Sequence, residues 1–302
     1  MKTKLIIAGG TGSVGEALIQ YFRDRFGSIV VLTRGNRPAS GNVRYVQWDA
    51  RTTGPWTREL EGADVVVNLT GKSVNCRNTE ENQKEIIRSR VDATRVLGQA
   101  IEHCLVPPRS WINASAAAIY GNTGDRVVDE DSPWADDETA NVSKQWEAAF
   151  DESDCAQTRK VVLRIGLVLQ KNKGVVEVLS KLARAGLAGS VGSGKQYVSW
   201  IHEADFVRLV EWVVDNEHFS GVINAVSPDP VTNKEFMKGF REGLGVKVGL
   251  PAPGWATRIG AFVIGTNAEL VLSGRRVHSN VLSGNFSFLH PRYTGAIRHL
   301  LK

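Results

Sequence analysis

Short apolar runs alternate with amphipathic stretches along the first half of the chain. Six runs rich in β-branched residues stand at 4–8, 29–33, 43–48, 64–69, 111–114 and 160–164. Between them, residues 14–26 and 81–103 carry apolar side chains at close to the helical period. Nearly continuous apolar strands that alternate with helices are typical of a parallel sheet buried on both faces. The first half therefore predicts an α/β fold.

The second half of the chain is less regular. Its expected elements are a glycine-rich loop at 189–195, a strand at 197–201, a helix at 204–216, a buried strand at 221–224 and a final helix at 291–301. Thr232 and Glu235 have the spacing of a capping box. They predict that another helix begins at this point.

These elements together predict a Rossmann-type doubly wound parallel sheet with a smaller, discontinuous C-terminal substrate lobe. The nucleotide-binding domain is expected to comprise residues 1–165 and about 203–226, and the lobe about 166–202 and 227–302. In open parallel sheets, ligands bind beyond the carboxyl ends of the strands. The cleft between the two parts is therefore the expected place for a nucleotide and a substrate.

Composition narrows the function classes. The 302 residues are 42% hydrophobic and 23% charged, an ordinary globular balance. The net charge is +5, but the arginines are scattered, so a solvated surface explains them better than nucleic-acid binding. Three cysteines at unrelated spacings fit neither a metal site nor a disulfide framework. Because the first apolar run is too short for a signal peptide and no window matches a membrane span, we expect a cytoplasmic protein.

A glycine-rich turn follows the first strand and opens the first helix. Its residues are Gly9, Gly10, Thr11, Gly12, Ser13, Val14 and Gly15. A dinucleotide fold needs glycine here for the tight turn, for backbone approach to the pyrophosphate and for close packing of helix on strand. The strand before it and the helix after it make an accidental glycine turn the weaker interpretation.

The end of the second strand indicates which dinucleotide is bound. An acidic residue there would contact the ribose hydroxyls of NAD(H), whereas this strand ends in Thr33 and Arg34. Arginine can bind a 2′-phosphate bidentately, so we predict NADP(H); a solvated surface arginine is the alternative. Asp49 could accept from the adenine amino group or be a simple turn residue. The cofactor groove is also expected to include Leu69, Thr70 and Gly71.

Further motifs extend along nearly the whole chain. They are Asn68-Leu-Thr-Gly71, Ala114-Ser-Ala-Ala-Ala-Ile-Tyr-Gly121, Leu163-Arg-Ile-Gly166 and Trp200-Ile-His-Glu-Ala-Asp205. With the glycine turn, they resemble the extended short-chain dehydrogenase/reductase superfamily. Narrower marks are Ile87-Arg-Ser-Arg90, Trp146-Glu-Ala-Ala149, Gly192-Ser-Gly-Lys-Gln196 and Val271-Leu-Ser-Gly-Arg-Arg-Val277. Through these, the chain is similar to the atypical group of epimerase family proteins, which bind NADP(H) and generally have no assigned substrate.

The resemblance implies a catalytic triad that this chain only partly retains. In the superfamily a serine or threonine, a tyrosine and a lysine act together on the substrate oxygen. Here the hydroxyl position falls on Ala116, next to Ser115, and the tyrosine position falls on Ala140, so only Lys144 matches. General acid–base help is worth about 10²–10⁴ in rate, so its loss must be replaced or accepted.

Three residues are candidates for the missing acid, and each has a structural alternative. Ser115 could instead bond the backbone at a strand end, Tyr120 could pack under the glycine turn, and His202 could anchor the following helix. Lys144 is expected to hold the nicotinamide ribose, with a surface lysine as the alternative.

The remaining expected contacts also come from the matched motifs. The cofactor site is completed by Arg90, Ala114, Lys144, Arg164 and Gly166. Gly166 would admit the nicotinamide ring, while Arg164 could orient a loop instead. Beside the substrate we expect Lys195, Gln196 and Trp200, although the tryptophan could equally belong to the core.

The resulting prediction is an NADP(H)-dependent oxidoreductase or epimerase that acts on a small carbonyl or hydroxyl compound. The competing hypothesis is a non-catalytic NADP(H)-binding protein that reports redox state to a partner. The missing tyrosine favours the second hypothesis. The retained Lys144, the Arg164-Ile-Gly166 motif and a full second lobe favour the first. We expect no metal, no nucleic acid and no membrane among its ligands and partners.

Overall fold

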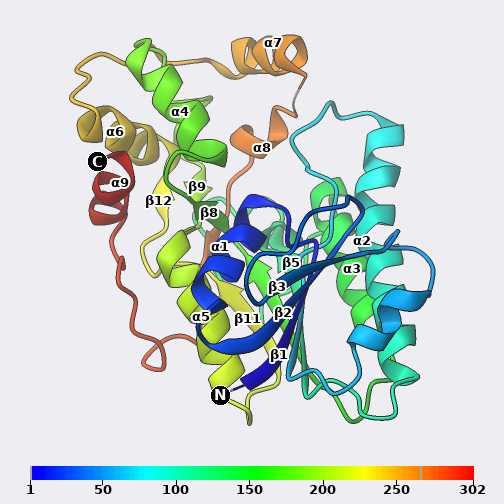
Figure 1. The fold of residues 1–302 in the computed structure, drawn as a ribbon. Helices are drawn as coiled ribbons and strands as arrows, with labels where there is room; N and C mark the ends of the chain where they lie inside the picture. Colours follow the sequence, from blue (N-terminus) through cyan, green and yellow to red (C-terminus); the bar gives the residue numbers. More distant parts are fainter. Residues whose placement is uncertain (1, 266) are drawn as a thin grey trace.

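Seven parallel strands form the centre of the molecule in a computed structural model that describes residues 2–265 and 267–302 (Figure 1). Their order across the sheet is β11-β7-β5-β4-β1-β2-β3. The strands are β1 Lys2–Ala8, β2 Phe26–Thr33, β3 Val43–Gln47, β4 Val65–Asn68, β5 Ser110–Ala116, β7 Arg159–Ile165 and β11 Gly221–Ala225. The strand order reverses between β1 and β4, and such a reversal opens a ligand crevice at the carboxyl edge.

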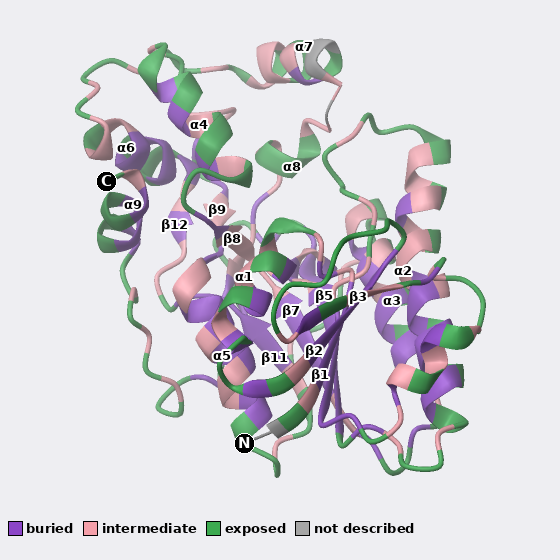
Figure 2. Cartoon of the chain, in the orientation of Figure 1, coloured by how far each residue is buried: buried purple, intermediate pink, exposed green. Residues whose placement is uncertain are grey.

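Helices cover both faces of this sheet. α1 (Ser13–Phe22) packs beside α5 (Glu203–Asp215) on one face, and α2 (Glu80–Glu102) packs beside α3 (Glu138–Asp151) on the other (Figure 1). Alternate residues of β1 pack against the helices on opposite faces of the sheet. Leu5 and Ile7 belong to one hydrophobic cluster, and Ile6 and Ala8 belong to the other. Both clusters are buried, as Figure 2 shows for the strands. The predicted doubly wound Rossmann-type sheet is confirmed.

A third hydrophobic cluster lies outside the sheet. It is built from α4 (Gly174–Arg184), α6 (Asn233–Gly243), α9 (Tyr293–Leu301) and the strands β8 (Leu167–Leu169) and β10 (Trp200–His202). Trp200, Phe236 and Tyr293 form its aromatic centre, with ring centroids of neighbours 5.1–5.6 Å apart. All of these segments belong to the ranges expected for the C-terminal lobe. The exact division into domains stays a prediction.

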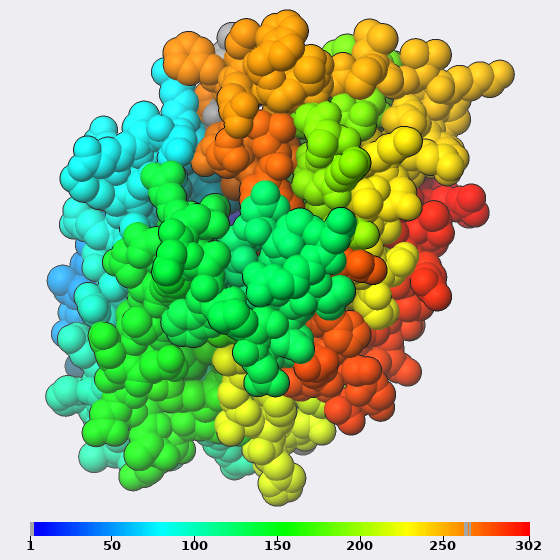
Figure 3. Space-filling model, turned by 180° about the vertical axis from the view of Figure 1, so that it is seen from behind, coloured from blue at the N-terminus to red at the C-terminus, as the bar shows by residue number. Residues whose placement is uncertain are grey.

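The remaining elements are short or were not anticipated from the sequence. They are β6 (Val127–Val128), β9 (Tyr197–Val198), β12 (Val231–Thr232), β13 (Arg276–Val277), α7 (Gly254–Ile264), α8 (Glu269–Leu272) and the 3₁₀ turns η1 (Pro55–Glu59) and η2 (Ala117–Tyr120). Seen from behind, the α7–α8 segment lies between the loop after β4 and the region of α4 (Figure 3). The guanidinium of Arg77 in that loop lies 5.5 Å from the ring centre of Phe262 in α7. The segment therefore contacts both parts of the molecule.

Two expected elements changed most. The strand expected at 197–201 is divided, because β9 pairs with β12 while β10 pairs with β8. The helix expected at 14–26 ends at Phe22, since Phe26 already pairs with Lys2 in the sheet. The predicted capping box is confirmed, with Thr232 and Glu235 bonded to each other's backbone. Among the described helices, none is long and apolar enough to span a bilayer.

Candidate functional site

The glycine turn joins β1 to α1 at the carboxyl edge of the sheet. Gly9 has a φ of +73°, and a Cβ atom there would lie 2.9 Å from the backbone of Thr70. A Cβ atom on Gly15 would lie 2.5 Å from Cα of Gly10, so the turn packs directly on the helix. At Gly12, by contrast, a Cβ atom would meet only the carbonyl oxygen of Gly9, at 3.9 Å. Gly12 therefore borders open space.

That space is lined by unused hydrogen-bond donors. Gly12 is the N-cap of α1 and provides no side-chain cap. Within the described chain, the amides of Ser13, Val14 and Gly15 have no acceptor, and the buried hydroxyl of Thr70 has no partner. A helix N-terminus with free amides and a favourable dipole is a natural phosphate site. The residues present therefore fit the pyrophosphate of a dinucleotide.

An arginine whose side chain has no described bonding partner lies at the end of β2. The side chain of Arg34 is exposed and bonds to no residue that the structure describes, while Thr33 accepts a hydrogen bond from the amide of Gly35 at 3.3 Å. Arg37, nearby, is 3.8 Å from the carboxylate of Glu16. The geometry leaves Arg34 free to meet a phosphate, and the contact itself stays a prediction.

Asp49 forms a turn instead of presenting a free carboxylate. Its Oδ1 accepts from the amides of Arg51 and Thr52, and its Oδ2 accepts from the hydroxyl of Thr52. Backbone and side-chain hydrogen bonds from Thr52 are the main reason that the pKa of Asp49 falls to about 2. The geometry agrees with the turn alternative, and the adenine contact stays a prediction.

Arg90 of α2 lies over the end of β4. A Cβ atom on Gly71 would be 2.9 Å from its guanidinium carbon. The guanidinium donates to the carbonyls of Lys72 and Ile86 and lies 5.0 Å from the ring centre of Trp146. Burial lowers the pKa of Arg90 to about 10, and no described carboxylate forms an ion pair with it. Arg90 is thus a desolvated cation without a counterion at the expected cofactor edge.

Helix α3 carries the position of the missing tyrosine. Asp137 caps the helix by accepting a 2.8 Å hydrogen bond from the amide of Ala140. Ala140 itself is 0% exposed, so the tyrosine position is covered by protein. Lys144, one turn further, donates a 2.5 Å hydrogen bond to the exposed Asp136. Its side chain is 26% exposed, which keeps the ammonium accessible to a ligand.

Ser115 and Tyr120 belong to a buried polar network. The hydroxyl of Ser115 donates to Glu147 at 2.5 Å, and Glu147 accepts two further hydrogen bonds from Arg164, at 2.9 and 2.8 Å. Arg164 also donates to the hydroxyl of Tyr120, which donates in turn to Asn224 at 2.9 Å. All five side chains are at most 3% exposed. The network fixes the carboxyl ends of β5, β7 and β11 to α3.

This network bears on three expectations. Ser115 and Tyr120 have no free hydroxyl to offer a substrate, and burial raises the pKa of Tyr120, which makes it a poorer acid. Burial acts to lower the pKa of Arg164, but the hydrogen bonds and charge of Glu147 raise it above its usual value. Arg164 is therefore neutralised by Glu147 and holds α3 to the sheet; its contact with the cofactor stays a prediction.

His202 also has a structural role. Its Nδ1 accepts a 3.0 Å hydrogen bond from the amide of Ala204, which makes it the N-cap of α5. The ring is 1% exposed, stacks on His290 at 3.9 Å and lies with Nε2 3.2 Å from Nδ1 of His299. Burial, with the two neighbouring histidines, lowers the pKa of His202 to about 3. The alternative of a helix anchor therefore replaces the expected substrate role.

The three histidines have the spacing of a metal site, with ligand atoms within 4.8 Å of one another. Because Nδ1 of His202 accepts a hydrogen bond, the proton of its neutral ring is on Nε2, the atom that faces His299. A metal-bound histidine instead donates through its other nitrogen. The arrangement is that of a hydrogen-bonded anchor.

Gln196 and Trp200, which were expected beside the substrate, stabilise the fold instead. Gln196 is 8% exposed and donates to two backbone carbonyls, each at 2.9 Å. Trp200 is 0% exposed, and its indole nitrogen donates to the carbonyl of Asp229 at 2.7 Å. Trp200 is therefore core and not a wall of the site, whereas Lys195 is exposed and keeps its side chain free of described partners.

Gly166 is required by packing between segments. A Cβ atom there would lie 2.8 Å from the carbonyl oxygen of Ser199 and 2.8 Å from the side chain of Val226. The close approach of Ser199, just before β10, requires a glycine at this position; its contact with a nicotinamide ring stays a prediction.

Sequence reasoning quoted two organising side chains, Glu147 and Asn68, within motifs but gave them no role. Glu147 lies two turns after Ala140 on the buried face of α3, and this helical spacing was the signal that could have found it. Asn68, at the end of β4, donates to Asn113 at 2.7 Å and to Thr94 at 3.1 Å. The indole of Trp146 also donates to Thr94, at 3.0 Å. Residues from several of the matched motifs thus meet in two polar networks at the carboxyl ends of the strands.

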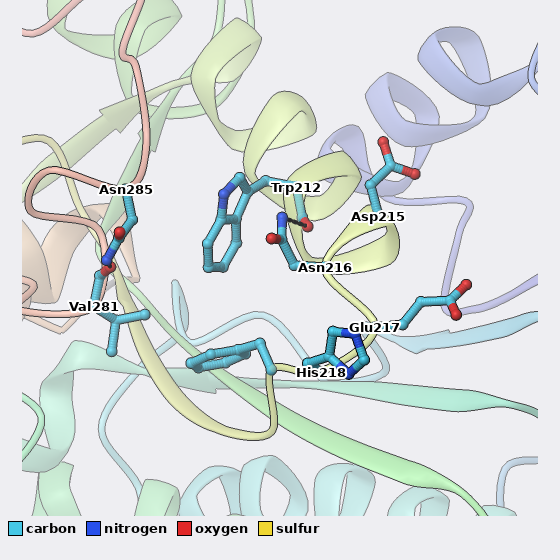
Figure 4. Close-up of a pocket in the computed structure, with 8 residues that line it drawn as sticks. Trp212, Asp215, Asn216, Glu217, His218, Val281 and Asn285 are labelled. Carbon is cyan, nitrogen blue, oxygen red and sulfur yellow. Dashed lines mark hydrogen bonds between the residues drawn. The ribbon is translucent and has the colours of Figure 1, made fainter.

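A surface hollow of about 660 Å³ lies at the other end of the sheet (Figure 4). Its lining residues are Trp212, Asp215, Asn216, Glu217, His218, Phe219, Val281 and Asn285. They come mainly from the end of α5 and the connection to β11, which is the amino edge. The hollow therefore includes none of the residues expected at the cofactor site.

Comparison with known proteins agrees with this geometry. The pattern of the NAD dependent epimerase/dehydratase family matches residues 5–225. Epimerase family protein SDR39U1 of Mus musculus is 31% identical over 304 residues, which cover 99% of each chain. The crystal structure of human epimerase family protein SDR39U1 with NADPH is 31% identical, with a TM-score of 0.87 over 99% of each chain.

A second solved structure is similar over this whole chain. The nucleoside-diphosphate sugar epimerase from Corynebacterium glutamicum is 28% identical, with a TM-score of 0.79, over 100% of this chain and 58% of that one. The family pattern extends from the first strand through β11, which includes the glycine turn, Arg90 and the α3 helix. The chain therefore belongs to the NAD dependent epimerase/dehydratase family.

Proposed function

We propose that the chain is an NADP(H)-dependent oxidoreductase or epimerase that acts on a small carbonyl or hydroxyl compound. The observation that carries this proposal is the set of free amides at the N-terminus of α1, close to the uncommitted Arg34 at the end of β2. The amides suit a pyrophosphate and the guanidinium suits a 2′-phosphate. The human relative was solved with NADPH, which carries both groups.

Lys144 is the chain's main contribution beside the nicotinamide in this proposal. When bound, the nicotinamide would exchange a hydride with a substrate carbon. Among the four expected catalytic residues, Lys144 alone keeps its polar atom accessible, while Ser115, Tyr120 and His202 are buried and bonded. Its ammonium can hold a ribose hydroxyl and place positive charge beside a substrate oxygen. In this proposal the substrate oxygen exchanges its proton with the Lys144 ammonium, which takes the place of the superfamily tyrosine.

A non-catalytic redox sensor is the second candidate function. The observation that favours it is the complete burial of Ala140, which leaves no room at that position for another proton donor. A sensor would keep the nucleotide contacts and need no acid, because it would transmit the bound state through a partner.

NADPH oxidation with a panel of aldehydes, ketones and keto sugars separates the two functions. An enzyme gives turnover that falls in Lys144→Ala, with Lys84→Ala, an exposed helix lysine that is also paired with an acid, as a matched surface control. A sensor binds NADPH and gives no turnover with any member of the panel. Failure to bind NADPH at all would overturn both proposals.

A further inference from the structure

Two helices of the C-terminal part expose large apolar side chains to solvent. On α7, Trp255, Ile259 and Phe262 follow one another at spacings of four and three residues, so they lie on one face of the helix. Their exposed fractions are 68%, 58% and 72%, whereas Ala261, on the opposite side of the helix, is buried. Large apolar side chains that gather on one exposed face mark a binding surface.

Helix α4 exposes a second set of the same kind. Val178 and Leu182, one helical turn apart, are both exposed, while Val176, Ser180 and Ala183 face the interior. The outer face of α4 is therefore apolar at its centre, as the outer face of α7 is.

The segments that join these helices make the two faces continuous. The turn after α4 lies beside the segment that leads into α7, because the amide of Leu250 donates to the carbonyl of Gly186 at 2.8 Å. Leu187 and Leu250, in these two segments, are also exposed. Both helices lie at the end of the C-terminal part that points away from the sheet (Figure 1). We call this surface, formed by residues 178–187 and 247–262, the α4–α7 face.

The charges on the α4–α7 face have one sign. In a chain whose net charge is +5, residues 178–187 and 247–262 contain no acidic residue and four basic ones, Lys181, Arg184, Lys247 and Arg258. Lys181 pairs with Glu177 and Arg258 pairs with Glu269, but all four side chains are exposed, and such pairs contribute little. Arg184 and Lys247 form no ion pair with any residue that the structure describes. The face is therefore apolar and positively charged at once.

The charge of the face decides which partner suits it. A second copy of the chain, docked through the same face, would place four positive charges against four, and like charges across an interface oppose association. An anionic lipid surface instead attracts every lysine and arginine. Tryptophan, phenylalanine and isoleucine on one helix face are also the side chains that enter the headgroup region of a bilayer. Basic side chains beside them can keep their charges among the headgroups while their stems cover apolar surface.

We propose that the α4–α7 face binds the surface of a membrane that contains anionic lipids, with the apolar side chains of α7 in the headgroup region. The expectation that no membrane is a partner rests on the lack of an apolar window long enough to span a bilayer. Binding to a bilayer surface requires no such window, only an exposed apolar helix face with basic residues beside it. The inference goes beyond the proposed function and does not depend on it.

Vesicle sedimentation of the full chain tests this assignment. Two kinds of vesicle are compared at low salt, phosphatidylcholine alone and phosphatidylcholine mixed with phosphatidylglycerol in equal parts. The protein should sediment with the anionic vesicles and stay in solution with the neutral ones. Added salt should release it, because charges at a lipid surface are screened as the Debye length falls to about 3 Å at 1 M.

A matched pair of lysines tests the charge of the face. Lys181 on α4 and Lys84 on α2 are each 71% exposed, and each pairs with a glutamate one turn earlier on its helix. Lys181→Glu should weaken binding to anionic vesicles by about tenfold or more, because it replaces an attracted charge with a repelled one. Lys84→Glu makes the same change in net charge away from the face and should leave binding near the parent level.

A second pair of variants tests the apolar side chains. Trp255→Ser combined with Ile259→Ser removes two exposed side chains of α7 and should weaken vesicle binding by about tenfold or more. Leu105→Ser removes a side chain that is 93% exposed in the loop before β5, at the amino edge of the sheet, and should have no effect. Because all three positions are exposed, we expect the thermal midpoints to stay close to that of the parent.

Three results would overturn the assignment. The first is a parent that fails to bind anionic vesicles or binds neutral ones equally well. The second is a loss in the Lys84 and Leu105 controls as large as the loss in the α4 and α7 variants. The third is a dimer, measured by light scattering without vesicles, that the Trp255→Ser/Ile259→Ser protein does not form, because the face would then belong to a second copy. NADPH titration of the same proteins reports on the proposed function separately.

Discussion

Arg34 is the residue on which the preference between the two cofactors is expected to depend. Its exposed side chain has no described partner, so a 2′-phosphate would be its first charged contact. A charge-assisted hydrogen bond is worth about 1.5–3 kcal/mol. Arg34→Asp should therefore lower NADPH affinity by about ten- to a hundredfold while NADH affinity changes little. Calorimetric titration of both cofactors measures this, with Arg37→Asp as the control. An unchanged NADPH-to-NADH ratio would show that Arg34 only faces solvent.

Ala140 is the second residue at which a substitution has a specific expected effect. Restoring the superfamily tyrosine by Ala140→Tyr is sterically opposed, because the position is 0% exposed. Overpacking a filled site costs about 1–3 kcal/mol. We expect the variant to have a lower thermal midpoint than the parent and no gain in NADPH-dependent turnover. Ala148→Tyr, on the exposed side of the same helix, is the matched control and should leave stability nearly unchanged. A stable Ala140→Tyr protein with new activity would show that the position opens when ligands bind.

At the scale of elements, two glycines of the same turn have different roles. Gly15 is required for packing, whereas Gly12 is required for ligand binding. Gly15→Ala should destabilise the fold, since its Cβ atom would lie 2.5 Å from Cα of Gly10. Gly12→Ala should leave stability near the parent level, because Gly12 has ordinary backbone angles and open space around it. The added methyl group would nevertheless occupy the approach to the free amides of α1 and weaken NADPH binding. Thermal unfolding and cofactor titration of both variants check this contrast. Normal NADPH affinity in a folded Gly12→Ala protein would place the pyrophosphate elsewhere.

The elements of the sheet were predictable because each buried strand had a continuous apolar run and each neighbouring helix an amphipathic period. The glycine turn was predictable because its geometry depends on backbone alone. Glu147 and Arg164 show where such reasoning ends. One lies on α3 and the other on β7, and only the fold reveals that they neutralise each other. Tyr120 and Ser115 had suitable chemistry and suitable positions in the sequence, but burial, a property of the whole fold, removes both hydroxyls from the crevice.

At the scale of the whole molecule, the two parts are joined through a few polar contacts beside the crevice. Gln170, which follows β8, donates to the carbonyl of Ser13 in the first turn of α1 at 3.1 Å. Lys173 pairs with Glu16 of the same helix at 2.9 Å. The C-terminal tail returns to α5, where the carboxylate of Asp205 accepts from the amide of His290 at 2.9 Å. The C-terminal segments thus contact the helix that would hold the pyrophosphate.

The tail contact makes the stability of the molecule sensitive to acid through His202. Its pKa falls from 6.5 to about 3 on folding, so the ring is neutral in both states above 6.5 and the shift has no effect there. Below that value the unfolded chain binds a proton that the folded protein excludes, and stability is lost until the folded group also titrates near 3. The groups that face the ring are His290, stacked on it, and His299, with Asp205 bonded to the backbone of His290.

The loss attributable to His202 should reach about 2 kcal/mol near pH 5. His202→Asn keeps an acceptor for the amide of Ala204 at the N-cap and removes the titrating ring. Denaturant unfolding at pH 7 and pH 5 should therefore show a larger drop in the free energy of unfolding for the parent than for this variant. The comparison within each protein cancels the packing cost of the substitution itself. Equal drops in the two proteins would mean that His202 becomes protonated without disturbing the fold, and that the stacked histidines do not hold the tail through their neutral forms.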